Sequence, residues 1–97
     1  MTYYHLLMSV FVVIAPELAG MKPFEEAIRT NFPNDHFVLG PNAWGVSALG
    51  ISKDVSDKIV GTNPGKNGPT LVVVSVSGYY GLAQNSVWEW FAAKLSA

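Results

Sequence analysis

The sequence of 97 residues predicts one small α+β domain with the element order βαββαβ, and three observations carry this prediction. Apolar residues alternate, or run together, near the amino end, in residues 36–49 and in residues 70–77, as in β-strands. Between these segments, apolar residues recur at helical spacing. No linker, internal repeat or low-complexity tract divides the chain, so we expect a single domain over residues 1–97.

The first half predicts a strand, a helix and a hairpin. Residues 4–14 are apolar at alternate positions and at most positions between them, which is typical of a strand covered on both faces. Pro23 opens a short helix in the first-turn position that proline tolerates. The turn Gly40-Pro41-Asn42 then joins two antiparallel strands, at 36–39 and at 43–49. The apolar face of the helix is Phe24, Ala27, Ile28 and Phe32.

The second half predicts a helix, a strand and a terminal helix. Ser52 is the predicted N-cap of the second helix, and Gly61 ends it. Residues 61–69 form a loop, residues 70–77 a strand, and the spacing of Ser86 and Glu89 predicts a capping box. This order is that of a ferredoxin-like sheet with two helices on one face and an added C-terminal helix. The terminal helix has the apolar residues Val87, Trp88, Phe91, Ala92 and Leu95.

The predicted topology leaves one face of the sheet uncovered. Both crossover connections are right-handed, so both helices lie on the same face. The apolar residues left on the other face would form a larger patch than soluble monomers expose, which favours a two-fold homodimer. The alternative is that the terminal helix covers this face. The predicted interface residues are Leu7, Phe11, Val13, Leu71 and Val73.

The composition excludes several classes of protein. Hydrophobic residues make up 49% of the chain and charged residues 13%, with a net charge of −1 and no basic run, which argues against nucleic acid as a partner. The absence of cysteine excludes a disulfide framework and thiolate metal sites. The apolar run at 6–15 is too short to span a membrane, and its flanks differ from those of a signal peptide. We therefore expect a cytoplasmic protein without membrane contact.

Three segments show similarity to a known family. In order and spacing, Asn42-Ala43-Trp44-Gly45-Val46, residues 71–76 and Trp88-Glu89-Trp90-Phe91 resemble the SinR-like branch of the CRISPR-associated adaptation nuclease superfamily. The resemblance implies a ferredoxin-like homodimer and, in the nuclease members, a metal-dependent phosphodiesterase with an Asp at the end of the first strand. The matching stretch Val13-Ile14-Ala15-Pro16-Glu17 has no Asp. We therefore predict no metal and no other cofactor.

Other candidate sites have weaker patterns. The run from Gly61 to Lys66 is one residue short of a phosphate-binding loop and connects a helix to a strand, the reverse of that motif. His5, His36 and Asp35 could share a metal, although their spacing does not require it. No nucleophilic serine motif is present, and no catalytic residue is identified.

Three aromatic residues are the predicted partner contacts. Trp90 is expected to point away from the apolar face of the terminal helix, and Tyr79 and Tyr80 lie between two glycines. The leading hypothesis is a non-enzymatic homodimeric protein-interaction module, a small adaptor or inhibitor linked to nucleic-acid defence by the resemblance, with an unidentified protein partner. One alternative is a divergent metal-dependent endonuclease acting on RNA or DNA, with Glu17 or Asp35 as metal ligand. Another is a purely structural oligomer.

Overall fold

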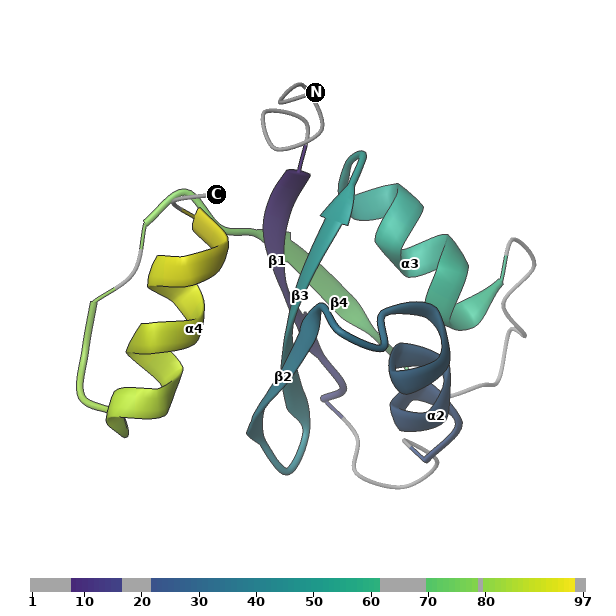
Figure 1. Cartoon of the computed structure of the whole chain (residues 1–97). Helices are drawn as coiled ribbons and strands as arrows, with labels where there is room; N and C mark the ends of the chain where they lie inside the picture. The colour runs from purple at the N-terminus through teal and green to yellow at the C-terminus, as the bar shows by residue number, and fades with distance from the viewer. Residues whose placement is uncertain (1–7, 17–21, 62–69, 79, 96–97) are drawn as a thin grey trace.

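The predicted order of elements is confirmed in the computed structural model, which describes residues 8–16, 22–61, 70–78 and 80–95 (Figure 1). The first strand is described from residue 8, and the earlier part of the predicted strand lies outside the described residues. The elements are β1 (Met8–Ile14), α2 (Lys22–Asn31), β2 (His36–Gly40), β3 (Ala43–Leu49), α3 (Ser52–Val60), β4 (Val72–Ser75) and α4 (Asn85–Leu95).

The four strands form one sheet in the order β2-β3-β1-β4, and each neighbouring pair is antiparallel. This confirms the ferredoxin-like α+β fold. The most apolar strand, β1, lies inside the sheet between β3 and β4, as its pattern predicts. Val13 is opposite Trp44 of β3 and Val73 of β4, so these three side chains share one face of the sheet.

The helices α2 and α3 cover that face and form the main core with it. Phe11 and Val13 are 1% and 0% exposed, and both pack with Ile28 of α2 and Val55 of α3 in one apolar cluster. The buried members of the cluster are Phe11, Val13, Ala15, Phe24, Ile28, Phe32, Trp44, Val46, Ala48, Val55 and Ile59.

The predicted orientation of the sheet is therefore wrong. Phe11 and Val13 lie in the core beneath the helices, and Leu71 and Val73 are packed against the same cluster. Leu7 lies outside the described residues. The side chains of β1 alternate between the two faces of the sheet, and both sets are largely apolar. The pattern therefore does not indicate which face the helices cover.

The terminal helix α4 packs on the opposite face of the sheet, where it contacts β1 and β2 (Figure 1). Val10 of β1 and Phe91 of α4 are both buried although neither belongs to the main core cluster. The described elements thus make three layers, with α2 and α3 on one side of the sheet and α4 on the other. Coverage by α4 is partial, because Val72 and Val74 of β4 are 45% and 41% exposed.

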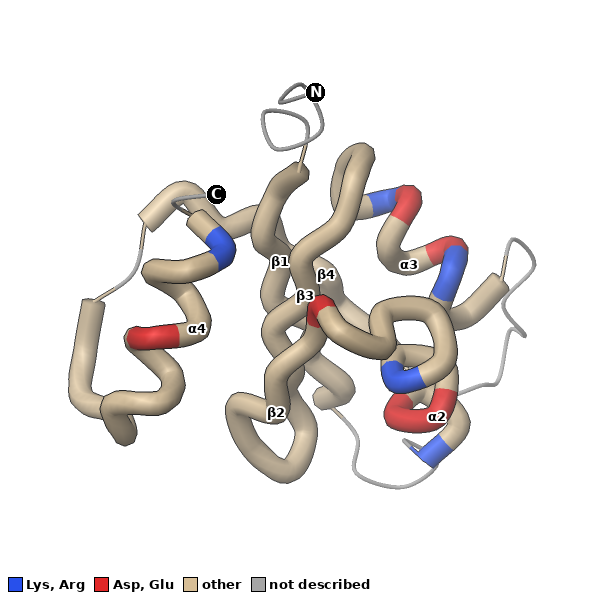
Figure 2. The backbone as a smooth tube through the Cα atoms, in the orientation of Figure 1, with Lys and Arg blue, Asp and Glu red and all other residues tan. Residues whose placement is uncertain are grey.

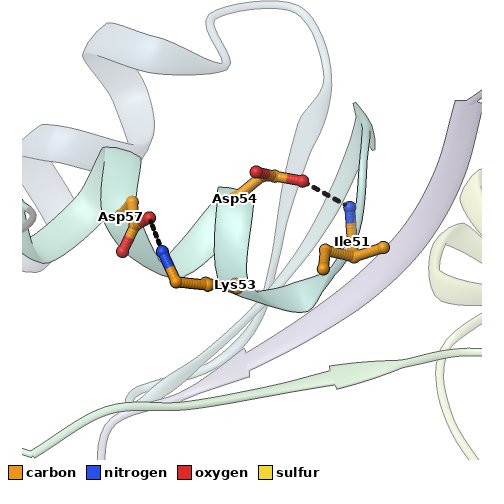
Figure 3. Close-up of polar contacts among 4 residues, drawn as sticks. All are labelled: Ile51, Lys53, Asp54 and Asp57. Carbon is orange, nitrogen blue, oxygen red and sulfur yellow. Dashed lines mark hydrogen bonds and ion pairs between the residues drawn. The ribbon is translucent and has the colours of Figure 1, made fainter.

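The start of α3 differs from its predicted capping. Ser52 is the first helical residue, and the N-cap is Ile51, whose backbone N–H donates to Oδ2 of Asp54 over 2.8 Å (Figure 3). Gly50 has a φ of 97°, and a Cβ there would collide with the Asp54 carboxylate. At the other end Gly61 closes the helix as predicted, with a φ of 80°.

The terminal helix also starts earlier than its predicted cap. It begins at Asn85, so Ser86 lies inside the first turn and not at the N-cap.

Candidate interaction surface

Several of the described acidic side chains, and His36, have a hydrogen-bonding partner within the fold. Asp57 pairs with Lys53 at 2.7 Å on one exposed turn of α3 (Figure 3), and Glu25 pairs with Arg29 at 3.1 Å on α2. The hydrogen bond and the charge of Asp57 raise the pKa of Lys53 above its ordinary value. His36 Nδ1 lies 2.6 Å from the carbonyl oxygen of Phe32, which accepts a hydrogen bond when that nitrogen is protonated.

These contacts do not assemble a metal centre. Within the residues that the structure describes, no group of three or more His, Asp or Glu side chains is placed to hold a metal ion. Oδ1 of Asp35, one of the candidate ligands, lies 2.7 Å from Nζ of Lys94. Two further candidate ligands, His5 and Glu17, lie outside the described residues.

Charge is unevenly distributed over the fold. Figure 2 shows that the charged residues lie mainly on α2 and α3, with a few more on α4 and one before β2. The strands β1, β3 and β4 have none, and neither do the described residues between 70 and 88. The chain therefore presents a charged side, formed by two helices, and an uncharged stretch that runs from β4 into α4.

The uncharged stretch also contains the most exposed apolar side chains. Tyr80 and Leu82, in the connection between β4 and α4, are fully exposed, at 102% and 103%. We call the described residues 77–78 and 80–84, all of them exposed, the exposed connection. Tyr79, predicted with Tyr80 as a partner contact, lies outside the described residues. Val72 and Val74 of the edge strand β4 are also exposed, at 45% and 41%.

Trp90 does not lie where the helical spacing predicts. It is half-buried, and its ring stacks on Phe37 of β2 with centroids 5.9 Å apart and an interplanar angle of 27°. Its other neighbour is Gly45 of β3, where a Cβ would lie 2.7 Å from Cζ3 of the indole. Trp90 also meets Phe91 edge to face, at 5.5 Å. This side chain therefore holds α4 on the sheet, a role that the sequence did not indicate.

The two edges of the sheet are built differently. At the β2 edge the register with β3 shifts between Val38 and Gly40, Pro41 follows directly, and α4 packs nearby. Bulges, prolines and covering elements are devices that protect an edge from further pairing. The other edge, β4, pairs with β1 in an unbroken register over all four residues and has neither proline nor charge. It is the unprotected edge of the described sheet.

Comparison with known proteins adds no further assignment. No protein-family model and no curated protein sequence matches the chain. The resemblance to the SinR-like branch therefore stays a prediction. Among the helices of the described residues, none has the length and hydropathy needed to cross a membrane.

Proposed function

We propose that the protein is a non-enzymatic homodimeric interaction module, an adaptor or inhibitor that contacts a partner protein through its exposed connection. The observation that carries this proposal is the full exposure of Tyr80 and Leu82 in an uncharged stretch. Burial of exposed apolar surface of this kind against a partner removes it from water, which stabilises the complex. Tyrosine is also among the residues that most often anchor a protein interface.

The chemistry of this surface favours protein over nucleic acid. A tyrosine could stack on a base, but binding of nucleic acid also needs cations that neutralise phosphates. No Lys or Arg occurs among the described residues from 70 to 88, and the lysines and arginines of α2 and α3 lie on the other side of the sheet (Figure 2). A link to nucleic-acid defence rests on the sequence resemblance alone.

Self-association is supported by the size of the domain and by its residual apolar surface. A domain of this length buries only about two-thirds of the surface of its unfolded chain, so further burial adds useful stability. Val72 and Val74 of the edge strand stay exposed. Two-fold dimers are the commonest assembly for such a chain.

The partner contact is tested by exchanging Tyr80→Ala and Leu82→Ser together. The control is Val38→Ser, which removes an exposed apolar side chain (60% exposed) from the opposite edge of the sheet. Affinity capture from the producing cells, quantified by mass spectrometry, should recover a protein with the wild type and the control and lose it with the double variant. The same proteins captured by all three chains would refute the proposed contact.

A further inference from the structure

We propose that the dimer forms by antiparallel pairing of β4 with β4 of a second copy, which joins the two four-stranded sheets into one. This inference rests on the proposed dimer and specifies its surface and register. It also replaces the interface predicted from the sequence, whose described residues face the core.

The backbone of β4 determines which groups face the open edge. The N–H of Val76 donates to the carbonyl oxygen of Val10 over 2.9 Å, just beyond the β1–β4 ladder. Hydrogen-bonded and non-hydrogen-bonded pairs alternate along an antiparallel ladder, so Val72 and Val74 also direct their backbone groups toward β1. The N–H and C=O groups of Val73 and Ser75 therefore point to the open edge, where a further strand can bind them.

The side chains favour one register for a symmetric pair. With the two-fold axis at Val73, this residue exchanges both of its backbone hydrogen bonds with Val73 of the second copy. Val72 then lies opposite Val74 of the second copy in a non-hydrogen-bonded pair, the arrangement in which opposing side chains are closest. Both exposed valines of each chain are covered in this way, on the α4 side of the sheet.

The absence of charge points to a second copy as the occupant. In a two-fold symmetric pair, residues close to the axis lie near the same residues of the second copy. A charged residue close to the axis would therefore face a like charge. The described residues of β4 and both its flanks have no charge, and no bulge or proline interrupts the strand. The bulged β2 edge lacks this self-complementarity.

The register is tested with cysteines, because the natural chain has none. Val72→Cys and Val74→Cys are made as separate proteins, then oxidised alone and after mixing. In the proposed register the two positions face each other across the axis, at a separation that a disulfide spans. We expect a disulfide-linked dimer in the mixture and none in either protein alone.

Each other outcome overturns a defined part of the inference. A cross-link in Val74→Cys alone moves the axis to Val74 and refutes the register. No cross-link in any sample, together with a light-scattering mass of two chains, refutes the β4 pairing and leaves the proposed dimer in place. A mass of one chain at all concentrations refutes both. A monomer that captures a foreign protein, and loses it on Ser75→Pro, assigns the edge to another partner and also refutes pairing with a second copy.

Discussion

The indole of Trp90 lies so close to the backbone of Gly45 that a Cβ at position 45 would stand 2.7 Å from Cζ3 of the ring. The same ring stacks on Phe37, the residue opposite Gly45 in the β2–β3 register. The Trp90 ring thus contacts both β2 and β3, at the position where Gly45 has no side chain. Gly45 is required for this close approach, and with it for the docking of α4.

Gly45→Ala should lower the free energy of unfolding by about 1–3 kcal/mol, because the added methyl group overpacks the contact with Trp90. Urea denaturation followed by far-UV circular dichroism measures the change. The control is Gly40→Ala, where an added Cβ meets no atom within 4 Å. In a Trp90→Leu background the cost of Gly45→Ala should fall. An equal cost in both backgrounds would show that the ring contact does not cause the effect.

Asp54→Ala should lower stability by about 1 kcal/mol, because the Ile51 N–H at the start of α3 loses its acceptor (Figure 3). Asp57→Ala is the matched control in the same helix. It removes only the exposed ion pair with Lys53, so its effect should be smaller. Thermal unfolding of the two variants makes the comparison. Equal losses would contradict the capping role of Asp54.

The ion pair between Lys94 and Asp35 should contribute about 0.2–1 kcal/mol to the attachment of α4, since both side chains are partly exposed. A double-mutant cycle with Lys94→Met and Asp35→Asn measures this coupling free energy. Added salt should reduce it by screening. A coupling that is unchanged at high salt would show that the pair does not act through charge.

RNA and DNA should remain intact when incubated with the protein and Mg²⁺ or Mn²⁺. Magnesium sites need one or two carboxylates free to bind, and the described Asp35, Asp54 and Asp57 already make ion pairs or caps. Glu17→Ala tests the carboxylate that follows the first strand in the sequence. Metal-dependent cleavage that this variant abolishes would refute the non-enzymatic proposal and support the endonuclease alternative.

Local patterns were sufficient to predict the order of elements. The turn at Gly40-Pro41-Asn42 identified the hairpin, and β3 spans the predicted residues 43–49. Gly61 identified the end of α3 because a positive φ favours glycine. The cap of α3 was missed because the helix begins one residue earlier than expected. The carbonyl oxygen of Ile51 accepts the first helical hydrogen bond, from the N–H of Val55, and the Asp54 carboxylate accepts one from the N–H of Ile51.

The assignment of faces could not be read from local patterns. Every strand residue from Val10 to Ile14 is apolar, so neither face of β1 was marked as the one that receives α2 and α3. The docking of α4 on the sheet was stated only as the alternative to a dimer, and the part that Trp90 has in it was missed. Helical spacing placed Trp90 off the apolar face, whereas the space that it fills depends on the missing side chain of Gly45, on a strand far away in the sequence.

The most direct test of the dimer at the β4 edge is the solution mass of the wild type and Ser75→Pro by light scattering. The substitution removes an N–H that faces the open edge and leaves the hydrogen bonds to β1 in place. Ser75→Thr, which keeps the N–H, is the control. We predict about twice the chain mass of 10.5 kDa for the wild type and the control, and a single-chain mass for Ser75→Pro. A monomeric wild type, or a dimer that survives Ser75→Pro, would contradict the account.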